Sequence, residues 1–243
     1  MFHPATSSLG SIIATEFEYA LMFTSEREFE SCPGIKGRSS GRNPHLQHSV
    51  KRCIDLLGAG ILTAVLFPVF IVIGLLVALD DGWPVIYRRR VVGTAGEFDA
   101  FKFRTMMRDA DSILATNPAL KAEFERNFKL KDDPRTTRVG ALLRKLSLDE
   151  LPQLFNVLRG QMSLVGPRMI TAAELDKYGP YKHLLLSLKP GLTGYWQVRG
   201  RQNVCYEDRV RMDLHYIEKW TLSMDLKILL ETPVKVLKRE GAF

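Results

Sequence analysis

Cysteine is scarce in this sequence: three residues, Cys32, Cys53 and Cys205, occur among 243. Their odd number and wide spacing exclude a framework of structural disulfides, and no Cys-x-x-Cys or Cys/His spacing suggests a zinc site. The five histidines show no ligand spacing either. An early apolar stretch beside a cleavage site is also missing, so a secretory signal peptide is not expected. These absences indicate a reducing environment that faces the cytosol.

Acidic residues are fewer than basic ones, 27 against 34, which gives a formal net charge of +7. Such a balance predicts an anionic partner: nucleic acid, phospholipid headgroups or a phosphorylated substrate. Nucleic acid is the least favoured of these, because no helix-turn-helix or zinc pattern appears and the cations lie beside an apolar segment. Residues 1–46 carry Ser, Gly, Pro and Arg without sustained periodicity, so we interpret them as a disordered basic tail.

Charge is almost absent from Ile54 to Leu79, where Asp55 is the single charged residue. A helix of this length can cross the roughly 30 Å hydrocarbon core of a bilayer, so a single-pass anchor is one interpretation. Pro68 favours another, because a proline in mid-helix removes a hydrogen bond and clashes with the preceding turn. Cationic residues flank both ends of the run: Lys51, Arg52, Arg88, Arg89 and Arg90. Since such flanks prefer the cytoplasmic side, we favour a re-entrant helix–break–helix hairpin over residues 47–88 that is broken at Pro68.

Residues 89–243 have the pattern of a cytosolic α+β domain that is predominantly helical. Gly93 to Gly96 suits a turn, and polar and aromatic residues alternate over 97–103, which predicts a small β-hairpin. Residues 106–128 are expected to be helical with an interruption at Asn117-Pro118, and a further helix is expected from Thr137 to Lys145. We expect some of these helices to be amphipathic and to lie at the membrane interface.

The segment LRKLSLDELPQL, Leu143–Leu154, supports two interpretations. Ser147 and Glu150 have the spacing of a capping box, which needs no chemistry. Pro152 prefers the first position of a helix, and that would place Asp149 and Glu150 in the turn just before it. Two carboxylates there would face the positive end of the helix dipole, as would a bound phosphate. On these residues alone a helix cap and a functional site are equally favoured.

Arginine-bearing turns elsewhere favour the functional site. The turn SLVGPR presents Arg168, the segment KPGLTGYWQVRGR presents Arg199 and Arg201, and Arg144 precedes the acidic pair. Glycine permits close approach of the backbone, and the arginine fork matches phosphate oxygens. A basic site with one pair of carboxylates suggests chemistry on a pyrophosphate with a divalent cation.

Four segments in this order resemble a known family: KFRTM at Lys102–Met106, LRKLSLDELPQL, NVLRGQMSLVGPR at Asn156–Arg168, and KPGLTGYWQVRGR at Lys189–Arg201. From about Lys51 to Phe243 the sequence resembles the bacterial sugar transferases, small monotopic phosphoglycosyl transferases that start exopolysaccharide assembly. The resemblance implies transfer of a sugar 1-phosphate from a UDP-sugar to undecaprenyl phosphate, with release of UMP and a requirement for Mg²⁺. It does not identify the sugar.

The resemblance also implies roles for individual residues. Asp149 would be the nucleophile that forms a covalent phosphosugar–aspartyl intermediate, and Glu150, with Asp149, would hold Mg²⁺. The family's membrane-inserted break corresponds to Pro68. Met169 stands where the family's Pro-Arg-Pro turn has its second proline, which predicts a looser loop around Arg168. The expected phosphate- or substrate-binding residues are Lys102, Arg104, Arg144, Arg168, Gln197, Arg199 and Arg201.

The expected location is the bacterial inner membrane, in contact with its phospholipids and with the catalytic domain facing the cytosol. A homodimer is compatible with the resemblance. The alternative is a membrane-tethered, non-catalytic basic module that recruits an anionic partner or polysaccharide-assembly proteins. That alternative explains the charge and the anchor but not four ordered motifs.

Overall fold

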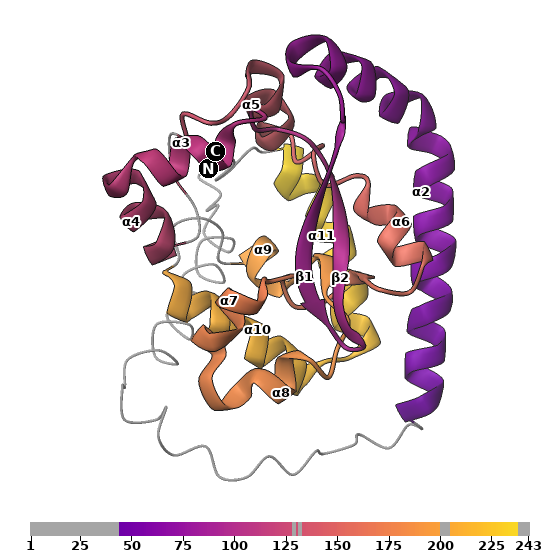
Figure 1. Cartoon of the computed structure of the whole chain (residues 1–243). Coiled ribbons are helices and arrows are strands. Elements are labelled where there is room, and N and C mark those ends of the chain that lie inside the picture. Colours follow the sequence, from indigo (N-terminus) through magenta and orange to yellow (C-terminus); the bar gives the residue numbers. More distant parts are fainter. Residues whose placement is uncertain (1–43, 128–129, 131–132, 200–204, 238–243) are drawn as a thin grey trace, which may run out of the picture. The chain divides into compact units, whose positions relative to one another are not determined.

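Helix α2, Pro44–Asp81, is the longest element of the fold (Figure 1). The computed structural model describes residues 44–127, 130, 133–199 and 205–237. With 38 residues, α2 is about 57 Å long at 1.5 Å per residue. The helix does not stop at Pro68, where the sequence predicted a break, but continues through it. Figure 1 shows α2 bending across the top of the view, as expected where a proline removes one helical hydrogen bond without ending the helix.

The first half of α2 is fixed to the rest of the protein by buried polar contacts. Asp55 is 4% exposed, and its Oδ1 accepts hydrogen bonds from the Ser163 hydroxyl at 3.0 Å and from the Leu164 N–H at 2.9 Å. Lys51 forms an ion pair with Asp225 at 2.5 Å. The single acid in the apolar run therefore joins α2 to residues 163–164 by hydrogen bonds.

The second half of α2 is fixed as well. Phe70 lies against Phe103 with ring centroids 5.8 Å apart. At the end of the helix, the Asp80 Oδ2 accepts from the Val139 N–H at 3.0 Å, and Arg104 donates to the Asp81 carbonyl at 2.8 Å. Both ends of α2 thus contact other elements of the compact unit Arg42–Phe243, to which α2 itself belongs.

Much of the remaining surface of α2 is apolar and exposed. Only 11% of its most apolar window is buried, and the helix is long and apolar enough to cross a membrane. Its most exposed large side chains are Leu46, Leu57, Ile61, Val65, Phe67, Leu75 and Leu79. The cost of leaving such a surface in water fits a helix that associates with a membrane.

The predicted β-hairpin is confirmed. Strands β1, Ile86–Gly93, and β2, Gly96–Phe103, pair antiparallel, with Tyr87 opposite Lys102 and Gly93 opposite Gly96. Gly96 has a φ of +104°, a conformation that favours glycine at this turn. Phe98 and Ala100 are buried on one face, as the alternating pattern predicted, and Phe103 is buried on the opposite face.

Short helices make up most of the remaining fold, which is predominantly helical. The interruption at Asn117-Pro118 and the helix before Lys145 are confirmed, the latter capped by Thr137, whose side chain accepts from the Gly140 N–H. The helices are α3 Ala110–Thr116, α4 Pro118–Asn127, α5 Arg138–Lys145, α6 Gln153–Leu158, α7 Ala172–Leu175, η1 Asp176–Tyr181, α8 Lys182–Leu185, α9 Tyr195–Arg199, α10 Tyr206–Lys219 and α11 Leu222–Leu237.

Two glycine-containing motifs meet in a second, parallel sheet. Strand β3, Ser163–Val165, pairs with β4, Gly191–Thr193. A Cβ on Gly166 would overlap the Lys189 carbonyl, and one on Gly191 would overlap the backbone of Gly166. These glycines therefore allow the two loops to approach each other closely, and the loops carry Arg168 and Trp196 into the same region.

Candidate active site

The turn between α5 and α6 holds the acidic pair. Ser147 has a φ of +55° and is not a helix cap, so the capping-box interpretation is wrong. Pro152 is the residue directly before α6, which places Asp149 and Glu150 in the preceding turn as the proline argument predicted. The Phe103 N–H donates to the Asp149 carbonyl at 2.9 Å, which joins this turn to the end of β2.

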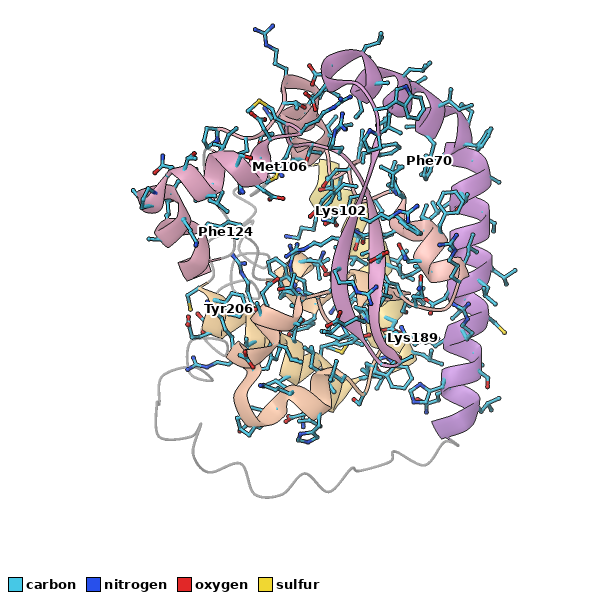
Figure 2. All side chains as sticks on the ribbon, viewed as in Figure 1. Phe70, Lys102, Met106, Phe124, Lys189 and Tyr206 are labelled. Atoms are coloured by element: carbon cyan, nitrogen blue, oxygen red, sulfur yellow. The ribbon has the colours of Figure 1, made fainter. Side chains whose placement is uncertain are left out.

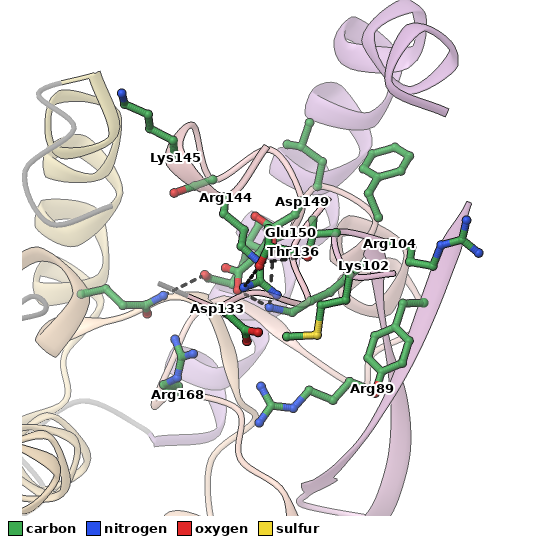
Figure 3. A pocket seen from close by; sticks show the side chains of 18 of the residues that line it. Arg89, Lys102, Arg104, Asp133, Thr136, Arg144, Lys145, Asp149, Glu150 and Arg168 are labelled. Atoms are coloured by element: carbon green, nitrogen blue, oxygen red, sulfur yellow. Dashed lines mark hydrogen bonds and ion pairs between the residues drawn. The ribbon is translucent and has the colours of Figure 1, made fainter. Parts of the chain in front are cut away.

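Lys102 lies between the two carboxylates (Figure 3). Its Nζ is 2.5 Å from Glu150 Oε1 and 4.0 Å from Asp149 Oδ2, and all three side chains are largely buried. The side chain projects from β2, and Figure 2 shows it on the hairpin, facing a space that Met106 and Phe124 border from the segments that follow. A buried ammonium group so close to two carboxylates keeps at least one of them ionised.

The two carboxyl groups differ in acidity. Burial raises the pKa of Asp149 above its ordinary value, and the charge of Lys102 opposes only part of that effect. Burial also acts against ionisation of Glu150, but the charges of Lys102 and Arg168 outweigh it and hold the pKa of Glu150 below its ordinary value. Glu150 is therefore the stable carboxylate of the pair, and Asp149 is the more basic one.

Arg144, from the last turn of α5, lies near Asp149. Its Nε donates to the Thr105 hydroxyl at 2.9 Å and its Nη1 to the Thr136 hydroxyl at 3.3 Å. Burial lowers the pKa of Arg144, and the negative charge of Asp149 offsets part of that effect. Because hydroxyls hold this guanidinium, its positive charge remains available to a phosphate.

Arg168 follows β3 and approaches the acidic pair from another side, apart from Arg144 in the view of Figure 3. Its backbone N–H donates to Asp213 at 3.3 Å, and its guanidinium lies 5.2 Å from the centre of the Trp196 ring. The sequence predicted a loose loop because Met169 replaces a proline. Met169 is instead buried, and the backbone of Arg168 forms a parallel β-bridge with Gly191. Core packing and this backbone pairing therefore hold the loop.

Other predicted site residues have different surroundings. The Arg104 guanidinium donates to the carbonyls of Asp81 and Gly82, at 2.8 Å and 2.5 Å, and so fixes the end of α2. Arg199 forms an ion pair with Glu231 at 2.8 Å and does not line the cavity of the acidic pair. Gln197 and Arg104 do line it. Arg201 lies outside the described residues.

Residues that sequence reasoning missed also reach this region. Arg89 pairs with Glu174 at 2.8 Å, and its charge contributes to the low pKa of Glu150. Arg209, from α10, lies 5.1 Å from the centre of the Trp196 ring. Tyr206 and Asp213 lie three and four residues to either side of Arg209, and this helical spacing could have indicated one inward face.

The acidic pair and the cations around it line one cavity of about 1690 Å³. Its walls come from the hairpin, α5, the loops after β3 and β4, α10 and α11. It contains Lys102, Arg144, Asp149, Glu150, Arg168, Trp196, Gln197 and Arg209. A large cavity that combines cations with one pair of carboxylates can bind a polyanionic substrate and present a nucleophile to it.

Comparison with known proteins gives a consistent result. Residues 46–239 match a family model described as bacterial sugar transferase. The chain is 44% identical over 203 residues to the UDP-galactose-lipid carrier transferase of Erwinia amylovora, covering 82% of this chain and 43% of that protein. It is 45% identical over 199 residues to the undecaprenyl-phosphate galactose phosphotransferase of Salmonella typhimurium, covering 80% and 42%. The exopolysaccharide production protein ExoY of Sinorhizobium fredii is 44% identical over 198 residues, covering 79% and 88%. The chain thus spans less than half the length of the first two relatives and most of the third.

Proposed function

Because the chain belongs to the bacterial sugar transferase family, we propose that it transfers a sugar 1-phosphate from a UDP-sugar to undecaprenyl phosphate and releases UMP. The names of two relatives include a UDP-sugar donor and an undecaprenyl-phosphate acceptor. The observation that carries the proposal is the buried Asp149–Glu150 pair beside Lys102, in a cavity that arginines line. This would be the first membrane step of exopolysaccharide biosynthesis.

Asp149 is the nucleophile in the proposed mechanism. Its carboxylate oxygen attacks the phosphorus that bears the sugar, and the bond from that phosphorus to the bridging oxygen of the diphosphate breaks. UMP leaves with the electron pair of that bond. A phosphate oxygen of undecaprenyl phosphate then attacks the same phosphorus, and Asp149 leaves as a carboxylate. Its raised pKa supports this role, because a more basic carboxylate is a better nucleophile.

The surrounding cations have a defined part in both steps. Arg144, held by two hydroxyls near Asp149, is placed to offset the charge of the phosphate under attack. Lys102 holds Glu150 ionised and orients it by their short ion pair. The two steps use one cavity in turn, so the nucleotide must leave before the lipid phosphate reacts.

Mg²⁺ belongs to this proposal, with Asp149 and Glu150 as its protein ligands. No group of three or more His, Cys, Asp or Glu side chains among the residues that the structure describes could hold a metal without further ligands. Two carboxylates still fit this ion, because Mg²⁺ commonly takes one or two carboxylates together with phosphate oxygens of the substrate. When bound, it would supply positive charge against the departing phosphate.

The membrane placement is also proposed. Asp55 near one end of α2 and Asp80 near the other both bind the same unit. A helix that crosses a bilayer completely would place those ends on opposite faces, so these contacts support a re-entrant course in the inner membrane, with the catalytic residues facing the cytosol.

The transfer reaction tests the proposal directly. The whole chain in lipid nanodiscs, with undecaprenyl phosphate and Mg²⁺, is expected to release UMP from at least one member of a panel of UDP-glucose, UDP-galactose and their N-acetylated counterparts. Asp149→Asn should abolish release, because the amide cannot form the acyl phosphate. Asp99→Asn, at an exposed carboxylate that pairs with Arg90 on the hairpin, is the matched control and should retain it. Full turnover by Asp149→Asn would refute the assignment.

A further inference from the structure

Two arginines from distant parts of the chain lie against one tryptophan in the cavity. The guanidinium carbons of Arg168 and Arg209 are 5.2 Å and 5.1 Å from the centre of the Trp196 ring, which is 6% exposed. Arg168 comes from the loop after β3, Arg209 from α10 and Trp196 from α9. We call these three residues the arginine–tryptophan cluster.

The positive charges of the cluster lack the partners that other arginines of the cavity have. Arg89 is paired with Glu174, and Arg135 with Asp133. Within the described parts of the chain, neither Arg168 nor Arg209 forms an ion pair, and Arg209 Nε is buried without a hydrogen-bond partner. The Trp196 Nε1 is likewise buried with no acceptor among those residues. The cluster therefore presents two buried donors, Arg209 Nε and Trp196 Nε1, that find no acceptor among the described residues.

Nearby carboxylates are engaged elsewhere. Asp213 accepts from the Arg168 backbone N–H and from the Tyr178 hydroxyl at 2.9 Å. Glu174 binds Arg89 and the N–H and hydroxyl of Thr171. Two guanidinium groups held close together on an indole, without an intervening carboxylate, repel each other. Burial and then the charge of Arg168 lower the pKa of Arg209 accordingly. An anion bound between them would remove that repulsion.

Arg168 and Arg209 line the same cavity as the acidic pair. Arg168 approaches that pair from the loop after β3 (Figure 3), and Trp196 joins Arg168 to Arg209. Any phosphate under attack must lie at Asp149. A phosphate directly bonded to it, as in a nucleoside diphosphate, would extend towards Arg168 and Arg209.

We propose that the arginine–tryptophan cluster binds the nucleotide phosphate of the donor, the one that leaves in UMP, with Arg209 as its outer ligand. This assignment rests on the proposed function. The acceptor has one phosphate, which must reach the attack position itself, so a second phosphate position is required by the donor alone. Trp196 holds both guanidinium planes, a role that depends on arginine and not only on positive charge.

The test compares Arg209→Gln and Arg209→Lys with Arg211→Gln, all in the whole chain in nanodiscs. Arg211 is on the same helix, pairs with exposed Asp208 and does not line the cavity, so its variant is the matched control. Titration calorimetry with UMP should show affinity weakened about tenfold to a hundredfold in both Arg209 variants, the range expected for loss of a charged hydrogen bond. Uridine, which lacks the phosphate, should bind all the variants and the wild type equally.

Kinetics separate the two possible sources of phosphate. Arg209→Gln should raise the KM for the UDP-sugar and leave the KM for undecaprenyl phosphate unchanged. An increase in the acceptor KM with unaltered UMP affinity would overturn the assignment, as would UMP affinity that Arg209→Gln does not change. Equal loss of UMP and uridine binding would also overturn it. If the wild type binds UMP in an Arg209-dependent way but transfers no sugar phosphate, the cluster assignment stands and the proposed function fails.

Discussion

Among single residues, Asp213 is a carboxyl outside the acidic pair whose acidity burial changes strongly. It is 1% exposed, and burial raises its pKa to about 7 from an ordinary value of 3.8, although hydrogen bonds from Tyr178 and Arg168 oppose the rise. Because it holds the backbone of Arg168, its protonation is linked to the loop that presents this arginine. The folded state keeps a proton on Asp213 that the unfolded chain releases above about pH 4.

Stability should therefore fall as the pH rises from about 4 to about 7, by up to about 1.4 kcal/mol for each pH unit between the two pKa values. Asp213→Asn removes this contribution and should flatten the dependence. Melting temperatures of both proteins at pH 5, 6, 7 and 8, in the same detergent, measure the difference. The same slope in the variant and in the wild type would contradict the linkage.

Individual site residues were predictable where local pattern determines them. Pro152 placed Asp149 and Glu150 in the turn before α6, because a proline restricts where a helix can begin. Sequence shows a charge but not its partner, so it could not show what Arg104 and Arg199 bind in the fold. Their guanidinium groups bind the end of α2 and Glu231. Arg209 was missed for the same reason, since Trp196 and Arg168 reach it only through the fold.

At the scale of elements, helix α2 shows what a local rule can and cannot predict. Its length and apolar character follow from the sequence, and so does the disturbance at Pro68. Whether a proline ends a helix or bends it depends on packing around it, here of Phe70 against Phe103 and of Ile73 and Val77 in a core cluster with Leu143. The hairpin was easier to predict, because its turn and alternation are local.

The proposed re-entrant course of α2 predicts a labelling pattern. In a cysteine-free background, Gln47→Cys before the apolar run and Thr94→Cys at the hairpin turn should both resist a membrane-impermeant maleimide in spheroplasts. Both should react once the membrane is permeabilised, because the proposed course places both sites in the cytosol. Reaction of Gln47→Cys in intact spheroplasts would show a spanning helix instead.

At the scale of the whole molecule, α2 shares a hydrophobic core with the hairpin and α5. Ile73 and Val77 are buried with Phe103 of β2 and Leu143 of α5, and Asp55 satisfies the N–H of Leu164. This integration was not predictable, since the sequence suggested separate membrane and cytosolic segments. The contacts of Asp55 join it to residues more than a hundred positions away, and no local pattern reports them.

Two truncations test this integration. A chain beginning at Pro44 retains all of α2 and should release UMP at a rate within about twofold of the whole chain, because its described contacts are intact. A chain beginning at Val85 should be inactive and should aggregate, since Phe103 and Leu143 lose the apolar surface that covers them. UMP release and size-exclusion chromatography in detergent measure both. A monodisperse, active fragment from Val85 onwards would contradict the shared core.

An anchor that completes the core makes folding and lipid insertion a single event under the proposed membrane placement. A newly made chain that has not reached a bilayer cannot finish the packing around Phe103 and Leu143. It therefore cannot set Asp149 against Lys102, whose strand ends at Phe103. Such a chain would be unable to consume nucleotide sugar where no lipid acceptor exists. Through its buried contacts, α2 would thus make the transferase activity depend on insertion into the membrane.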